Sequence, residues 1–280
     1  MSVAEPPRRM SRHRAAAIQF AVSFSIVASC LAAMLFVWYP APYFQAMGAK
    51  GLVLIMLAVD VTLGPLLTWI VFTPGKPLHL LRLDLVVIGA LQVAALAYGI
   101  HVVAQARPVY MVFVRDRFEI TSADDILPAS LAKAAPPFRT LPWDGPRLAA
   151  AVPPADPDEQ LRLMMSALAG ADLKTYPQYY LPYEAMVDTV REKGRPIAWL
   201  RERRPESAAA LTRAVAKTGL PESKLVFLPL HGPKGDLAVL LDKSSGRIVG
   251  YAPVDPWPDT TVRGTGATHS PSRADRSTST

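Results

Sequence analysis

Three long apolar stretches near the amino terminus constrain the fold more than any other feature of this chain. They cover residues 15–39, 51–72 and 85–105, and Asp60 carries the only formal charge within them. A helix needs about 20 apolar residues to cross a bilayer, and a backbone inside lipid must satisfy its own hydrogen bonds. The sequence therefore predicts a membrane protein with three transmembrane helices, joined by the short loops 40–50 and 73–84.

The charged residues are distributed unevenly, which supports this division of the chain. Residues 1–104 hold 7 of the 30 Lys and Arg and 3 of the 23 Asp and Glu. The net charge of +7 is shared between the two parts, so neither part has the charge typical of a nucleic-acid-binding protein. The single Cys excludes an internal disulfide framework and a Cys-rich metal site.

The basic residues that flank the apolar stretches predict the orientation. Four arginines lie within residues 1–14, the first loop carries only Lys50, and the second carries Lys76 and Arg82. Because short cytoplasmic segments are enriched in Lys and Arg, we expect the amino terminus in the cytoplasm and residues 106–257 on the outer side. An alternative is a lipoprotein signal cleaved before Cys30, but residues 31–39 prolong the apolar run beyond the length of a signal core.

Asp60 is a candidate functional residue, because an acid inside a membrane helix is costly and has a partner as a rule. Gly64 and Pro65 follow one turn later and predict a kink. In an antiparallel arrangement Gln92 lies at a similar depth and is the expected hydrogen-bond partner. Asp60 is then either a structural acid that joins the three helices or a site for a polar group from another membrane helix; a lone acid does not make a proton relay.

The remainder of the chain predicts an outer α+β domain with an antiparallel sheet. Residues 107–121 alternate around a turn at Arg115 and Asp116, which is typical of a hairpin. Residues 224–230, 236–241 and 247–251 are the other three expected strands. Helices are expected over residues 157–169, 184–193 and 206–217, and residues 197–203 lie between the last two without an assigned conformation. Residues 258–280 are small and polar, and we interpret them as a disordered tail.

Residues 133–158 are rich in proline and predict an extended loop on the surface of the domain. A ligand for an aromatic groove is the alternative. At its end Asp156 is the expected N-cap and Pro157 the first residue of a helix.

Two segments are candidate partner surfaces. The first contains the tyrosines Tyr176, Tyr179, Tyr180 and Tyr183. Tyrosine is favoured at interfaces, whereas the alternative is a proline-braced loop packed on the core. The second is a cationic cluster with Arg201, Arg203 and Arg204, which either meets an anionic partner or is simply solvated.

Catalytic motifs are missing from the sequence. The five histidines are scattered without metal-ligand spacing, and there is no nucleophile elbow, Walker loop or dinucleotide fingerprint. The pair Asp124 and Asp125 follows Ser122 and indicates a helix cap rather than a metal site. We therefore predict a binding protein without cofactor, metal site or catalytic residues.

Several ordered motifs resemble the type IV pilin accessory proteins called TfpX/TfpZ, over about residues 11–257. The segments that carry the resemblance are WYP at 38–40, VDVTLGPLLT at 59–68, FTPGK at 72–76, AQARPVY at 104–110, YYLPY at 179–183 and VDPW at 254–257. The resemblance implies a bacterial inner-membrane protein with a periplasmic domain that assists pilin stability or pilus assembly. It implies type IV pilin, other pilus assembly proteins and the lipid bilayer as partners, and it transfers no catalytic residue.

Three functions follow as hypotheses. The first is a chaperone-like, non-catalytic accessory protein for type IV pilin, with Asp60 facing the pilin amino terminus. The second is a membrane-bound enzyme that modifies pilin or a periplasmic glycan. The third is a sensor, which the short cytoplasmic segments disfavour.

Overall fold

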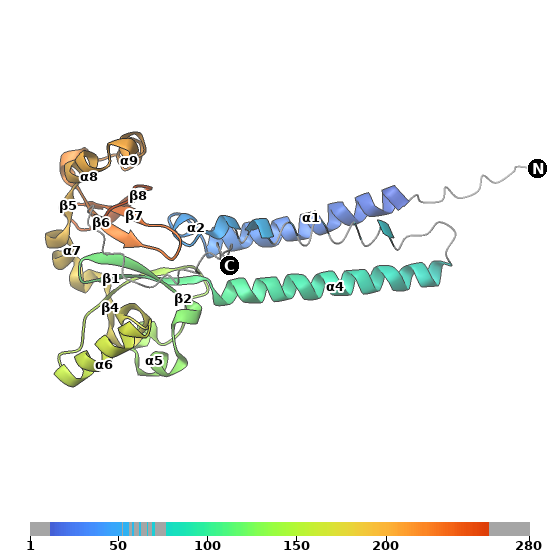
Figure 1. The fold of residues 1–280 in the computed structure, drawn as a ribbon, viewed down its shortest axis with the longest axis horizontal. Helices are drawn as coiled ribbons and strands as arrows, with labels where there is room; N and C mark the ends of the chain where they lie inside the picture. The colour runs from blue at the N-terminus through green and yellow to red at the C-terminus, as the bar shows by residue number, and fades with distance from the viewer. Residues whose placement is uncertain are drawn as a thin grey trace, which may run out of the picture.

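The computed structural model describes residues 12–51, 53–55, 58, 62, 66, 69–70 and 77–257. Two long helices, α1 (Arg12–Val37) and α4 (Leu78–Gln105), run side by side and form a stem, and a mixed α/β unit at one end forms the sheet domain, residues 107–257 (Figure 1). Within the described residues, Phe20–Val37 and Val86–Gln105 are long and apolar enough to cross a membrane. Most side chains of both segments are exposed, as the sequence predicts for helices whose solvent is lipid.

The stem agrees with two of the three predicted spans. The last stem helix, α4, begins at Leu78 rather than at residue 85, because Pro77 occupies its N-cap and no further proline interrupts it before Gln105. Most of the stretch 51–72 lies outside the described residues, so the middle span stays a prediction.

The sheet domain is built on an eight-stranded sheet. Seven strands follow the order β4-β3-β1-β2-β6-β7-β8, and β5 pairs with β6 beside this path. The strands are β1 (Pro108–Val114), β2 (Arg117–Ser122), β3 (Arg147–Ala151), β4 (Tyr180–Pro182), β5 (Arg195–Pro196), β6 (Leu225–His231), β7 (Leu237–Asp242) and β8 (Ile248–Ala252).

The prediction of an antiparallel sheet is wrong, because the sheet is mixed. β1 pairs parallel with β3, and β2 pairs parallel with β6. Parallel neighbours need a long crossover, and the hundred residues between β2 and β6 supply one. The five expected strands are present, but β3 lies within the segment 133–158 that we interpreted as a loop.

The first hairpin confirms its prediction and adds a bulge. β1 and β2 are antiparallel around Arg115, which adopts the left-handed conformation that the tight turn requires (φ 59°). A register shift between Pro108 and Tyr110 places Val109 in the same core cluster as Tyr110 and Val112, rather than with Met111 as strict alternation predicts. Both faces of β1 are buried, so this strand lies in the interior of the domain.

Helices cover both faces of the sheet (Figure 1). They are α5 (Pro128–Lys133), α6 (Pro157–Leu168), α7 (Val187–Lys193), α8 (Ile197–Arg203) and α9 (Ala208–Lys217). The predicted N-cap of α6 is confirmed, since the Asp156 side chain accepts a hydrogen bond from the Asp158 backbone. The predicted cap after β2 is also confirmed, since the Ser122 N–H donates to Asp125 Oδ2 at 2.9 Å.

Candidate functional site

Within the stem, the predicted polar site is described only in part. Gln92 in α4 donates from Nε2 to the Ser23 hydroxyl in α1 at 3.0 Å, so it links the two helices. Asp60, Gly64 and Pro65 lie outside the described residues. The pairing of Asp60 with Gln92 therefore stays a prediction, and Gln92 has a described partner in Ser23.

The stem joins the sheet domain through a buried arginine. Only Ala106 and Arg107 separate the end of α4 from β1. Arg107 is 4% exposed, and its guanidinium donates to the Ala104 carbonyl at 2.5 Å and to the Pro142 carbonyl at 3.3 and 3.4 Å. The guanidinium also lies over the Trp143 ring, 3.9 Å from its centroid. One side chain thus ties the helix end to the proline-rich segment, at the base of the sheet domain.

The end of α1 is fixed to the same place. The Trp38 indole N–H donates to the Trp143 carbonyl at 3.0 Å, and the two rings lie 6.0 Å apart. The turn that carries Trp143 approaches α1 so closely that a Cβ atom on Gly145 would lie 2.8 Å from the Val37 carbonyl oxygen. Gly145 also has a φ of +121°, which only glycine adopts readily. Both stem helices therefore end against one rigid loop.

The loop that follows α1 forms part of the domain core. Its short helix α2 (Tyr43–Ala46) buries Tyr43 and Ala46 in the same cluster as Met111 and Leu230 of the sheet. The Lys234 N–H, in the turn between β6 and β7, donates to the Ala46 carbonyl at 3.0 Å. In that turn a Cβ atom on Gly232 would lie 2.7 Å from both the Ala46 Cβ and the Ala46 carbonyl oxygen. This contact holds the first loop on the sheet domain.

A polar cluster at the same turn joins the last described residue to the sheet. His231 Nδ1 lies 2.8 Å from Asp236 Oδ1, and the Trp257 indole N–H donates to Asp236 Oδ2 at 2.7 Å. Partial burial by itself raises the pKa of Asp236, but the hydrogen bonds from His231 and Trp257 outweigh it and hold that pKa below its usual range. No local pattern in the sequence pairs these residues, because the histidines are scattered along the chain and Trp257 lies 21 residues from Asp236.

The structure divides the tyrosine segment between the interior and the surface. Tyr180 and Tyr183 are buried, and their hydroxyls donate to the carbonyls of Lys174 and Gly246. Tyr176 and Tyr179 are half-buried, with ring centroids 6.2 Å apart. A partner surface in this segment is thus restricted to Tyr176 and Tyr179, for which it stays a prediction.

The predicted cationic cluster is engaged within the domain. Arg201 pairs with Glu222 at 2.7 Å, and Arg203 lies over the Trp199 ring at 4.6 Å. Arg204 donates to the Trp257 carbonyl at 2.8 Å and lies 3.6 Å from the Asp255 carboxylate. Contact of these arginines with an anionic partner stays a prediction. Such a partner would have to compete with the intramolecular contact that each arginine already makes.

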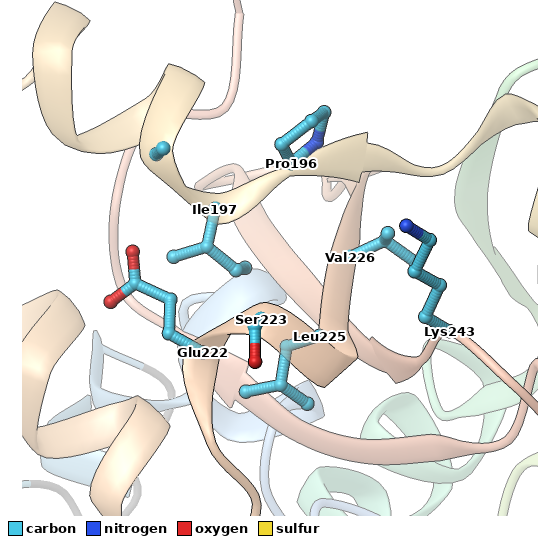
Figure 2. Close-up of a pocket in the computed structure, with 8 residues that line it drawn as sticks. Pro196, Ile197, Glu222, Ser223, Leu225, Val226 and Lys243 are labelled. Atoms are coloured by element: carbon cyan, nitrogen blue, oxygen red, sulfur yellow. The ribbon is translucent and has the colours of Figure 1, made fainter.

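Two clefts lie on the surface of the sheet domain. Neither is lined by a combination of residues that is typical of a catalytic site. The first is a cleft of about 310 Å³ beside β5 and β6. Figure 2 shows the carboxylate of Glu222 and the amine of Lys243 on opposite sides of this cleft, with Ile197 and Ser223 between them. The second, of about 470 Å³, is lined mainly by apolar groups of β3 and β8 and by Tyr43. In the described part of the chain no group of three or more His, Cys, Asp or Glu is placed to hold a metal ion.

Helix α6 presents an uncovered apolar face. Its inner side packs through Leu163 on the core cluster of β1 and β3, whereas Met164 is 65% and Leu168 81% exposed. Leu161 and Met165 are exposed as well, so the uncovered positions follow the spacing i, i+3, i+4, i+7 of a single helix face. We call these four residues the α6 face. Figure 1 shows helix α6 on one side of the sheet domain, farther from the stem than α5. The spacing was visible in the sequence, but there it predicts burial.

Comparisons with known proteins identify the family of this chain. A family model described as fimbrial assembly protein FimB matches residues 7–48. The chain is 32% identical over 230 residues to the fimbrial assembly protein of serogroup I from Dichelobacter nodosus, a match that covers 81% of this chain and 89% of the relative. It is 31% identical over 229 residues to the serogroup E1 protein of the same organism, with the same coverage. No solved structure gives a significant match. Because both relatives are above 30% identity over 81% of this chain, the resemblance to pilus accessory proteins is confirmed, and the chain belongs to the family of fimbrial assembly proteins.

Proposed function

We propose that this protein is a chaperone-like, non-catalytic accessory protein of the bacterial inner membrane, which assists type IV pilin stability or pilus assembly. The observation that carries the proposal is the match to fimbrial assembly proteins over 89% of their length. Two apolar helices joined rigidly to a folded domain supply contacts both inside and outside a membrane, which suits a partner with an apolar helix and a soluble head.

The proposal includes a topology. Three spans, at residues 15–39, 51–72 and 85–105, place residues 1–14 in the cytoplasm and the sheet domain in the periplasm. Its support is the pair of apolar helices and the excess of arginine before the first span. Residues 258–280 then follow the domain as a polar tail in the periplasm.

The topology places Asp60 where it can pair with the amino terminus of a pilin helix lying against the stem. Replacing it by asparagine removes the negative charge and keeps the size, so we expect less pilin to co-purify with the Asp60→Asn chain. The control is Asp84→Asn, which removes an acid from α4 at the cytoplasmic end of the proposed span 85–105. Equal pilin recovery with the two variants would remove the pairing from the proposal.

Outside the membrane, we assign the contact with the soluble head of pilin to the α6 face. Its distance from the stem argues against lipid as the covering group (Figure 1). Tyr179 packs against the same core cluster as Leu163, so this half-buried tyrosine lies on the same side of the sheet and borders the proposed contact.

The test of the function as a whole is deletion of the gene. If the protein stabilises pilin or assists assembly, the deletion strain should show fewer surface pili, less cellular pilin, or both, and the wild-type gene supplied in trans should restore them. Pili are counted by electron microscopy and pilin by immunoblot. Normal values of both, under conditions in which the parent strain makes pili, contradict the proposal.

A further inference from the structure

An exposed tryptophan lies at the level where both stem helices end. Trp143 belongs to the proline-rich segment of the sheet domain, yet it is 62% exposed. Its neighbours are Trp38, one residue after α1, and Arg107, two residues after α4. The position of the indole along the stem is therefore fixed by the ends of the two helices rather than by the body of the domain.

The environment of Trp143 holds its ring in place. One face stacks on the Arg107 guanidinium at 3.9 Å, and its backbone carbonyl accepts the Trp38 indole N–H at 3.0 Å. The close approach of Gly145 to Val37 fixes the turn that carries it. A ring held in this way loses little conformational freedom on binding.

Other large apolar side chains are exposed near this level. Phe36 in the last turn of α1 is 83% exposed. Leu127 is 60% exposed and follows the 3-10 turn Ala123–Asp125, which contacts α4. We call Trp143 and Leu127 the basal residues of the sheet domain, since they come from two loops on its stem side.

We propose that the basal residues dock into the headgroup region of the outer leaflet, so that the sheet domain rests on the bilayer. The occupant is the lipid surface, because the contact is continuous with the two helix ends that emerge from the lipid in the proposed topology. Tryptophan is the side chain most favoured at this depth, where its ring meets apolar chains and its N–H remains hydrated. The inference rests on the proposed topology.

Fluorescence quenching in reconstituted lipid vesicles tests the proposal with the full chain. The vesicles contain either ordinary phosphatidylcholine or phosphatidylcholine brominated near the headgroup end of its acyl chains, without any other protein. The Trp143→Phe variant keeps an aromatic ring over Arg107 and the carbonyl that binds Trp38, so the junction is preserved. We expect the fraction of tryptophan emission quenched by bromine to fall in Trp143→Phe relative to the unsubstituted chain.

Trp199→Phe is the matched control, because Trp199 belongs to α8 and its ring packs on Phe227 of β6, within the sheet domain. Its removal deletes an unquenched emitter, so the quenched fraction should rise. If Trp143→Phe raises the quenched fraction in the same way, Trp143 does not contact lipid and the inference is overturned. Alkaline carbonate extraction distinguishes a failure of the topology from a failure of the docking. A chain that is released from membranes contradicts the proposed topology. A chain that is retained, but whose Trp143 is not quenched, contradicts only the docking of the basal residues.

Discussion

Replacing Gly232 by alanine should loosen the first loop from the sheet domain and destabilise the protein by about 1–3 kcal/mol, the usual cost of overpacking. The added Cβ would lie 2.6 Å from the Gly235 carbonyl oxygen and 2.7 Å from the Ala46 Cβ, so backbone on one side or the other has to move. If α2 is displaced, Tyr43 leaves the core cluster that it shares with residues of the sheet. Chemical unfolding in detergent measures the stability, and amide hydrogen exchange of residues 43–47 measures the release of the loop.

Gly235→Ala is the matched control within the same turn. A Cβ atom at this position has a nearest neighbour, the Gln45 carbonyl oxygen, at 3.7 Å, which is an ordinary contact. We expect this variant to unfold and exchange like the unsubstituted chain. If the two variants behave alike, the close packing of α2 on the turn does not hold the loop, and the account of the junction fails at this point.

A double substitution of the α6 face, Met164→Gln with Leu168→Gln, should lower the recovery of pilin with this protein by about tenfold or more. A few apolar side chains at the centre of an interface carry most of the binding free energy, and each tenfold corresponds to about 1.4 kcal/mol. Both side chains are mostly exposed, so the stability of the sheet domain should change by less than about 0.5 kcal/mol. Pilin is quantified by immunoblot after affinity purification of the tagged variant.

The control for the α6 face is Ala167→Gln, which adds the same polar side chain at an exposed position on the flank of the helix. This variant should recover as much pilin as the unsubstituted protein. Undiminished recovery with the double variant, at unchanged stability, shows that pilin binds elsewhere and withdraws the assignment.

The elements that the sequence predicted correctly are those whose signal is local. The two described stem helices follow from the length of their apolar runs. The first hairpin follows from alternation around Arg115, and α6 follows from the N-cap Asp156 and Pro157 at its first position. Each of these signals operates within a few residues of the chain, independently of what packs against the element.

The features that the sequence did not predict depend on distant partners. β3 contains Ala149, Ala150 and Ala151, which favour helix when isolated, and they form a strand because they lie between β1 and β4. The parallel pairing of β2 with β6 arises in the same way, since it joins segments about a hundred residues apart.

The candidate site shows the same limit. Tyr180 and Tyr183 are of a residue type that is enriched at interfaces, yet both are buried in the core. Only the tertiary structure distinguishes a tyrosine at an interface from a tyrosine in the core. Arg107 gave no signal because its acceptor, the Pro142 carbonyl, lies 35 residues away. The only local sign of the buried role of Arg107 is that it is a single basic residue shortly after the apolar span 85–105.

The short connection between α4 and β1 has a mechanical consequence for any partner with two contact points. Only Ala106 and Arg107 separate the helix from the sheet, and Arg107 donates hydrogen bonds both to Ala104 in α4 and to Pro142 in the sheet domain. We therefore expect α4 and the sheet domain to move as one rigid body. A partner helix that turns α4 about its axis also turns the sheet domain, and a load on the domain is transmitted back into the stem. For a partner anchored in the membrane, the second contact then forms at the high effective concentration of an intramolecular step, without the entropy cost of ordering a flexible linker.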